Sequence, residues 1–168
     1  SKTNSEKENN IQRCIDENLS FVSVKTKEEQ RKTFEKIDCF VVGSDQVWNP
    51  DHFDEVYLLD FVPENIRKIS YASSIGVEQL PETLKGKYKK YLKRFDSISV
   101  REAKAANVIE KLVNKPVNVV LDPTLLLDGT SWNLFARKAH LGRDLPQKYI
   151  LTYFVGNNIS HWEEVKSI

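Results

Sequence analysis

Four short apolar segments form the main feature of the hydrophobic pattern, and small or polar residues follow each of them. They are residues 38–43, 66–71, 97–100 and 117–121. Continuous apolar runs of this length are typical of strands buried on both faces, as in a parallel sheet. Their centres lie roughly 20 to 30 residues apart, the spacing of strand–helix–strand units. The pattern therefore predicts an α/β fold in which a parallel sheet is flanked by helices.

Apolar residues at helical spacing fill two of the gaps. The first helix is predicted from Pro81 to Phe95, with basic side chains between its apolar positions. These basic residues are Lys85, Lys87, Lys89, Lys90, Lys93 and Arg94. We interpret them as a solvated face, with phosphate binding as the alternative. The second helix is predicted to begin at a capping box of Ser99 and Glu102 and to continue along Leu112.

The amino-terminal part carries weaker signals. Residues 1–20 form a polar segment to which no element is assigned. A strand is predicted at 21–24. Thr26 and Glu29 have the spacing of another capping box, which predicts a mostly polar helix that extends to Ile37.

The pattern divides the chain into one domain and the beginning of another. Residues 21–140 are predicted to form the first domain, which ends with a short helix at 131–139. A linker follows at 141–147, and 148–168 reads as a buried strand and the start of a helix. A strand and half a helix cannot bury a core, so we expect a truncated second domain. The chain contains no Met and begins with Ser, which also favours a fragment of a longer protein.

Composition narrows the class of protein. The 168 residues are 40% hydrophobic and 29% charged, as in soluble globular proteins. A formal charge of +1 argues against a strong overall field for nucleic acid. No stretch approaches the ~20 apolar residues of a membrane span, and the start is polar, so we expect a cytoplasmic protein. Cys14, Cys39 and the three histidines show no metal-site spacing, so no metal is expected.

Polar and small residues occupy the position after each predicted strand. The carboxyl ends of parallel strands share one edge of a sheet, where open α/β folds bind ligands. We therefore expect a site for a sugar or a phosphate at this edge. The candidate residues are Gly43, Ser44, Asp45, Gln46 and Trp48 after the first strand, Ser73, Ser74 and Gly76 after the second, Arg101 and Glu102 after the third, and Asp122 after the fourth.

Several candidates have a structural alternative. Gly43 either approaches a ligand or closes the strand. Ser44 and Asp45 either hold a substrate hydroxyl or cap a turn. Trp48 either stacks on a sugar ring or belongs to the core. The small residues at 73–76 either let the backbone approach a ligand or form a tight turn.

Arg101 is the candidate with the most specific chemistry. It is placed in the first turn of the second helix, where free N–H groups and a guanidinium together favour an anion. The alternative is an ion pair with Glu102 or another acid. Asp122 is interpreted as structural, because Pro123 fixes the exit from the strand and Asp122 can accept a loop N–H.

Four segments resemble the polysaccharide pyruvyl transferase family. They are residues 38–50, 69–76, 98–102 and 120–127. The most specific part is Gly-Ser-Asp-Gln-Val-Trp at 43–48, and the likeness spans about residues 34–156. The resemblance implies a two-domain fold like that of the GT-B glycosyltransferases, with a cleft between two Rossmann-like halves. This chain would hold the first half.

The resemblance also implies an activity. Enzymes of the family move pyruvate from phosphoenolpyruvate onto a pair of sugar hydroxyls as a ketal, in bacterial surface-polysaccharide assembly. Asp45 and Arg101 are then expected to be catalytic, with Arg101 serving the phosphate or carboxylate of the donor. The expected substrate-binding residues are Gly43, Ser44, Gln46, Trp48, Ser73, Ser74, Gly76 and Glu102.

The implied partners are phosphoenolpyruvate, as a co-substrate without a further cofactor, and a glycan or lipid-linked sugar. A lipid-linked acceptor would bring the protein to the membrane periphery. A GT-B glycosyltransferase that uses a nucleotide sugar and a non-catalytic glycan-binding or assembly module are the alternatives. The family begins with a strand and an Asn-Tyr-Gly-type loop and carries an Arg-Leu-His-like donor segment in its second half. Neither occurs in these 168 residues, so we expect them to be inactive alone.

Overall fold

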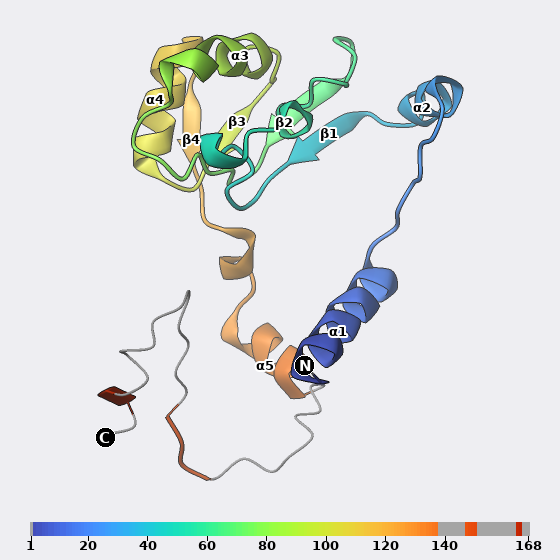
Figure 1. Ribbon diagram of the computed structural model, residues 1–168, viewed down its shortest axis with the longest axis vertical. Helices are drawn as coiled ribbons and strands as arrows, with labels where there is room; N and C mark the ends of the chain where they lie inside the picture. The colour runs from blue at the N-terminus through green and yellow to red at the C-terminus, as the bar shows by residue number, and fades with distance from the viewer. Residues whose placement is uncertain (1, 138–146, 151–163, 166–168) are drawn as a thin grey trace. The chain divides into compact units, whose positions relative to one another are not determined.

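The computed structural model describes residues 2–137, 147–150 and 164–165, and the chain divides into two units, Ser1–Leu126 and Leu127–Ile168. Figure 1 shows the helices and strands with their labels. The first unit contains helices α1 (Lys2–Asn18), α2 (Lys27–Phe34), α3 (Glu82–Leu92) and α4 (Ala103–Val113), strands β1 (Cys39–Val42), β2 (Arg67–Ser70), β3 (Ile98–Val100) and β4 (Val117–Val119), and 3-10 turns η1 (Pro50–His52), η2 (Glu55–Leu58) and η3 (Pro123–Leu125). The second unit contains α5 (Gly129–Arg137).

The four strands of the first unit are parallel and follow one another in chain order. β1 pairs with β2, with Cys39 opposite Arg67, and β3 pairs with β4. Parallel bridges between Ile69 and Ser97 and between Ser73 and Val100 connect β2 to β3. The predicted α/β fold with parallel strands and flanking helices is therefore confirmed.

Two buried serines join β2 to β3. The Ser99 backbone N–H donates to Ser70 Oγ (3.0 Å), and Ser70 Oγ donates to the Ser99 carbonyl (3.0 Å). In return, Ser99 Oγ donates to the Ser70 carbonyl (2.7 Å) and accepts from the Ala72 N–H (3.3 Å). The two hydroxyls thus satisfy backbone groups that an unbroken strand ladder would pair directly.

The serine pair corrects the predicted start of the second helix. Ser99 lies inside β3, and its hydroxyl is committed to β2 rather than to a helix N–H. Helix α4 begins at Ala103, with Glu102 at the N-cap and no side-chain capping bond. The capping-box prediction was wrong because buried backbone groups between the strands claim the hydroxyl first.

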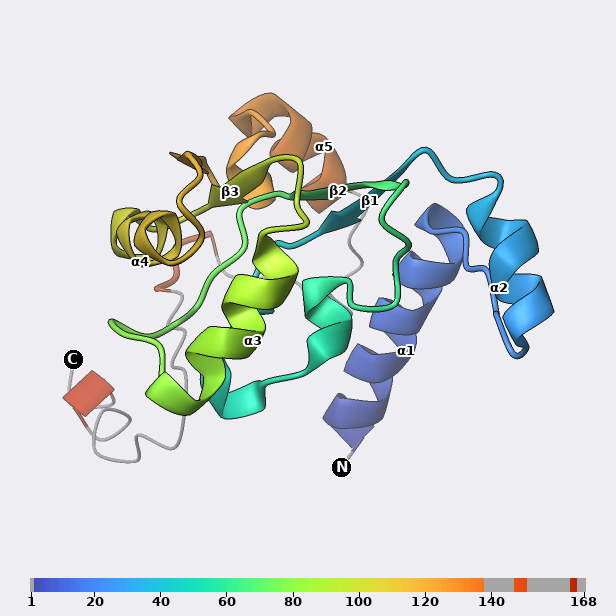
Figure 2. The ribbon, with the colours of Figure 1, turned by 90° about the horizontal axis from the view of Figure 1, so that it is seen from above.

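Helices α3 and α4 pack against each other and cover the core side of the strands. Figure 2 shows α3, α4 and the strands from above. The core between them contains Val42, Tyr88, Leu92, Ile98 and Ile109, all buried. Burial on this side is what the apolar spacing of the two helical segments predicted.

The prediction that the strands are buried on both faces holds only in part. All three residues of β3 are buried. In β1, Val42 is buried and its neighbour Val41 is 60% exposed. Successive side chains of a strand point to opposite faces, so the face opposite the α3–α4 core is the more open one at β1.

The predicted helix limits at α3 and α2 are correct to within a few residues. Pro81 occupies the N-cap of α3, which ends at Leu92, short of Phe95. The capping box of α2 is confirmed, because the Glu29 N–H donates to Thr26 Oγ1 (3.1 Å) and Glu29 accepts from the Thr26 N–H (3.0 Å). The helix ends at Phe34 rather than Ile37.

The two ends of the chain differ more from expectation. Residues 2–18 form the unpredicted helix α1, and 21–24 form no strand and are exposed. Phe21 and Val22 are 72% and 69% exposed, and no residue from 21 to 24 pairs in a strand, so the strand prediction was wrong. Helix α5 (Gly129–Arg137) begins two residues before the predicted 131–139, and the last two predicted positions lie outside the described residues. Residues 148–150 show no strand, while the predicted linker up to 146 and positions 151–155 lie outside the described residues.

Candidate active site

The loops that follow β1, β2 and β3 lie side by side. The Ser74 N–H donates to the Asp45 carbonyl (2.9 Å), and the Trp48 N–H donates to the Ser74 carbonyl (3.1 Å). The next pair of loops is joined by a bond from the Arg101 N–H to the Ser73 carbonyl (3.3 Å). The strand ends therefore share one edge, as parallel pairing requires.

At this edge Arg101 contacts three carboxylates, each through a different nitrogen. Nη2 lies 3.2 Å from Asp45 Oδ1, Nε lies 3.0 Å from Glu102 Oε1, and Nη1 lies 3.0 Å from Asp122 Oδ2. We call these four residues the Arg101 cluster. It unites the ends of β1, β3 and β4, whose residues are far apart in the sequence.

The members of the Arg101 cluster differ in their exposure. The Arg101 side chain is 26% exposed and the Asp122 side chain is similarly shielded, whereas the Asp45 side chain is 85% exposed. Asp45 also has a left-handed backbone, with φ at 58°. The carboxylate of Asp45 is therefore the part of the cluster most open to a ligand.

The charges of the Arg101 cluster do not cancel. Burial tends to lower the pKa of Arg101, but its hydrogen bonds to Glu102, Asp122 and Asp45 outweigh burial and raise that pKa. The Thr124 backbone N–H, the Thr124 hydroxyl and then Arg101 lower the pKa of the Asp122 carboxyl. One guanidinium faces three carboxylates, so with all four groups ionised the cluster is anionic.

A small open pocket of about 320 Å³ lies beside the cluster. Its walls are formed by Gln46, Ser74, Gly76, Val77, Glu78, Glu102, Lys104 and Ala105. Glu102 Oε2 is shielded from solvent and has no hydrogen-bond partner among the described residues. Four of the predicted substrate-binding residues thus line one cavity, next to the two predicted catalytic residues.

Comparison with models of known protein families gives a match over nearly the whole chain. A model of the polysaccharide pyruvyl transferase family matches residues 3–166. The chain belongs to this family. No curated protein and no solved structure matches it. The family assignment makes the protein a member of a transferase family, and the Arg101 cluster lies within the matched range.

The two glycines at the edge of this pyruvyl transferase family member allow close approaches inside the protein. Gly43 has φ at +126°, and a Cβ there would lie 2.0 Å from the Tyr71 carbonyl oxygen. Gly76 has φ at +63°, and a Cβ would lie 2.5 Å from Gln46 Oε1. At both positions the backbone conformation and the close neighbours favour glycine.

Three predicted binding residues are buried in the transferase. Trp48 is 1% exposed, its Nε1–H donates to the Tyr57 carbonyl (2.8 Å), and its ring packs edge-on against Phe95. Ser73 Oγ donates to the Val42 carbonyl (3.3 Å), and Ser74 Oγ accepts from the Gly76 N–H (3.1 Å). These packing contacts leave no open ring face on Trp48 for a sugar.

The structure also places Arg101 and Ser44 relative to the helix and the loop. Arg101 precedes the Glu102 N-cap of α4, so the prediction that it stands in the first helical turn was wrong. Strand β3 continues to Val100, past Ser99, where the capping box had placed the start of the helix. Ser44 is half-buried next to Asp45 in the loop.

Lys104 is the pocket residue that sequence reasoning missed, and Asp122, which was expected at this edge and interpreted as structural, has a second role there. Asp122 does cap η3, by accepting from the Thr124 N–H (3.0 Å), but it also binds Arg101. Its position after the fourth strand was the signal that it belongs to the same edge. Lys104 lines the pocket and pairs with Glu78, and no spacing rule singled it out.

The described residues contain no group of three or more His, Cys, Asp or Glu side chains arranged to hold a metal ion. The three acids of the Arg101 cluster hold a guanidinium instead. Within the same part of the chain, no helix has both the length and the apolar character needed to cross a bilayer.

Proposed function

We propose that this chain forms the acceptor side of an enzyme that transfers pyruvate from phosphoenolpyruvate to two hydroxyls of a sugar. Family membership supports a transferase, and the Arg101 cluster supports the position of the site. In this proposal the product is a cyclic ketal in a bacterial surface polysaccharide. The enzyme is cytoplasmic and GT-B-like, with its cleft shared between two domains and with no cofactor besides the co-substrate.

The charge of the Arg101 cluster is the observation that supports its assignment to the acceptor. Each Arg101 nitrogen already donates to a carboxylate, so a donor phosphate would have to displace one of them. The surplus negative charge also repels an anion such as phosphoenolpyruvate. Carboxylate oxygens accept hydrogen bonds from neutral sugar hydroxyls without that penalty. We therefore assign Arg101 a positioning role instead of the expected contact with the donor.

The bonds and protons that the reaction moves indicate a role for the Arg101 cluster. The enol carbon gains a proton and becomes a methyl group, two sugar oxygens bond to the central carbon, and the C–O bond to phosphate breaks. The two hydroxyl protons end on the methyl group and on the departing phosphate. A carboxylate that accepts a hydroxyl proton assists the attack of that oxygen. In this scheme exposed Asp45 takes the proton, and Arg101 holds Asp45 in place.

The pocket next to the cluster supports the binding of a polar ring. Gln46 and Glu102 lie on its wall, and Glu102 Oε2 has no partner in the described chain. A sugar hydroxyl that donates to Glu102 Oε2 would satisfy this oxygen. Pocket and cluster together would hold two neighbouring hydroxyls of one sugar.

Steady-state kinetics of the natural full-length protein test the proposal. We would measure acceptor-dependent phosphate release from phosphoenolpyruvate for the wild type, Asp45→Asn and Arg101→Lys. Removing a general base typically costs about 10²- to 10⁴-fold in rate. We expect such a loss for Asp45→Asn and a higher acceptor KM for Arg101→Lys. Asp16→Asn on α1 is the matched control and should behave as the wild type.

Two results would overturn this assignment. A higher KM for phosphoenolpyruvate in Arg101→Lys, with an unchanged acceptor KM, would return Arg101 to the donor. Transfer from a nucleotide sugar, with no turnover of phosphoenolpyruvate, would make the protein a glycosyltransferase.

A further inference from the structure

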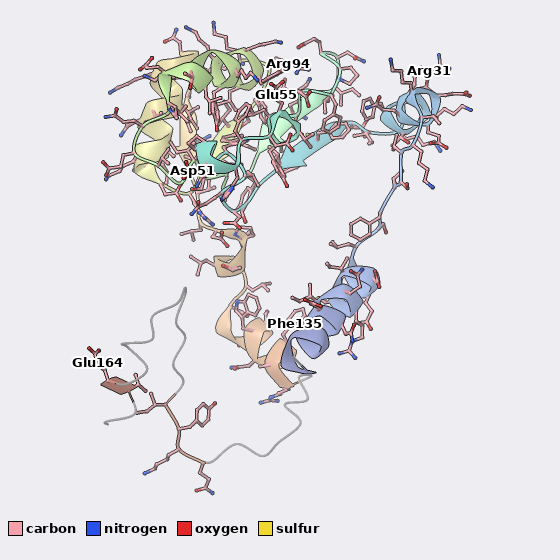
Figure 3. All side chains as sticks on the ribbon, in the orientation of Figure 1. Arg31, Asp51, Glu55, Arg94, Phe135 and Glu164 are labelled. Carbon is pink, nitrogen blue, oxygen red and sulfur yellow. The ribbon has the colours of Figure 1, made fainter. Side chains whose placement is uncertain are left out.

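Helices α3 and α4 carry lysines on both sides of a shallow groove. Lys85 of α3 and Lys111 of α4 line this groove of about 270 Å³, with Leu80, Val108 and Leu112 among its other walls. Lys89 and Lys93 follow Lys85 at intervals of four residues, and therefore on one side of the helix. Figure 3 shows nitrogen-tipped side chains that project outward from the two helices. We call Lys85, Lys89, Lys93 and Lys111 the lysine platform.

The two rows of the platform are held together at the end of α3. Lys115, just beyond α4, donates from Nζ to the carbonyls of Lys93 (2.6 Å) and Phe95 (2.8 Å). These bonds cap the last carbonyls after α3 and fix the distance between the helices. The residue that follows the end of α4 by two positions is therefore bonded to the end of α3.

Much of the positive charge of the platform has no acidic partner. Lys85 pairs with Glu82, whereas Lys89, Lys93 and Lys111 form no ion pair within the described residues. Residues 81–95 contain six basic residues and one acidic residue, a net charge of +5. The whole chain has a charge of only +1, so its remaining residues are acidic on balance. Within this segment, Lys87 and Arg94 pair with Glu55 and Glu64, so the unpaired charge of the platform comes from Lys89, Lys93 and Lys111.

We propose that the lysine platform docks the protein onto a bilayer that contains anionic phospholipids. Clusters of four or more lysines on a helical surface favour such membranes, because each charge interacts with a fluid array of headgroups. The platform consists of lysine rather than arginine, and lysine acts as a point charge that needs no fixed geometry. This proposal does not depend on the proposed reaction, since membrane binding is measured without donor or acceptor.

The same surface lacks the features that other polyanions use. Proteins that bind single-stranded nucleic acid stack bases on exposed aromatic rings, but Tyr88 and Tyr91 of α3 are buried. Protein interfaces rely on aromatic or arginine anchors at their centre, and the exposed positions between the lysines of α3 include only Gly86 and polar side chains. Charge complementarity without anchors favours the lipid surface.

Vesicle co-sedimentation of the full chain tests the proposal. The wild type should bind vesicles of phosphatidylcholine mixed with phosphatidylglycerol, and it should not bind phosphatidylcholine alone. Binding should disappear at about 1 M salt, where charges are screened beyond roughly 3 Å. Each lysine near an anionic surface strengthens binding about fivefold. The affinity of the triple variant Lys89→Glu, Lys93→Glu and Lys111→Glu for the anionic vesicles should therefore fall at least about 100-fold.

A second triple variant separates the platform from overall charge. Lys25→Glu, Lys27→Glu and Lys36→Glu change the same number of charges at exposed positions in and around α2, and should retain most of the binding. If the platform variant fails to fold by circular dichroism, the Gln variants at the same three positions replace it. The proposal would be overturned if both triple variants lost the same affinity for anionic vesicles, or if the wild type bound both vesicle types equally. Tighter binding to a DNA oligonucleotide than to the vesicles would also overturn it.

Discussion

Asp45 and Arg101 lie 56 residues apart in the sequence, and their side chains form an ion pair with Oδ1 and Nη2 at 3.2 Å. The pair connects the loop after β1 to the residue after β3. It exists because parallel strands bring their carboxyl ends to one edge. The same guanidinium also binds Glu102 and Asp122, so Arg101 organises the whole edge.

Replacing Arg101 with Ala should destabilise the protein at neutral pH by about 1 to 2 kcal/mol, because it removes three charge-assisted hydrogen bonds and leaves carboxylates that repel each other. The bonds from Thr124, and to a smaller extent Arg101, lower the pKa of Asp122 from its ordinary 3.8. The part of this stabilisation that comes from Arg101 is present above that pH and is lost as the pH falls below it. The difference between wild type and Arg101→Ala should therefore shrink below about pH 4.

Urea unfolding at pH 7 and pH 3 checks this expectation. Arg31→Ala on α2 is the control, since Arg31 (Figure 3) pairs with Glu35 at 3.9 Å and its side chain is 74% exposed. An exposed pair of this kind contributes about 0 to 1 kcal/mol. An equal loss for Arg101→Ala at both pH values would contradict the role of the carboxylates.

Two glycine substitutions should have opposite effects. Gly43→Ala places a Cβ 2.0 Å from the Tyr71 carbonyl oxygen at a positive φ, and should cost at least about 2 kcal/mol. Gly86 lies inside α3, where a Cβ would meet no atom within 4 Å. Gly86→Ala should stabilise the protein by about 0.5 to 1 kcal/mol, because alanine loses less conformational entropy in a helix. In thermal unfolding, the melting temperature of Gly43→Ala should lie below that of the wild type, and the melting temperature of Gly86→Ala should lie above it.

The stability of the protein should depend on Tyr88 at alkaline pH. Burial raises the pKa of Tyr88 to about 12, and its hydroxyl donates to the Trp48 carbonyl (2.8 Å). The raised pKa means that the contribution of neutral Tyr88 is complete below the ordinary value of 10 and is lost as the pH rises through about 12. The size of this loss is about 2 to 3 kcal/mol.

Unfolding experiments between pH 9 and 12 compare the wild type with Tyr88→Phe. The variant should start about 1 kcal/mol less stable, because the Trp48 carbonyl loses its donor, and its stability should fall less steeply with pH. Tyr57→Phe, at an exposed ring, is the control and should follow the wild type. Parallel curves for Tyr88→Phe and the wild type would show that Tyr88 does not titrate in this range.

The sequence alone determined the elements that depend on local pattern. Apolar runs located all four strands to within a few residues, and helical spacing located α3 and most of α4. The capping box at Thr26 and Glu29 was also correct. These features are encoded by neighbours along the chain, since burial and capping have fixed periods and offsets.

Tertiary structure alone decided which groups pair at the edge of the sheet. Ser99 looked like a helix cap and instead bridges β2 and β3, because Ser70 and the Ala72 N–H lie beside it only after the strands pair. Strand order predicted that Asp45 and Arg101 share an edge, and an ion pair of Arg101 with Glu102 was the alternative given by the sequence. Only the structure shows that Asp45 and Asp122 bind the same guanidinium together with Glu102. A hydrogen bond or an ion pair requires atoms within about 3 to 4 Å, and between distant segments only the packed fold fixes such distances.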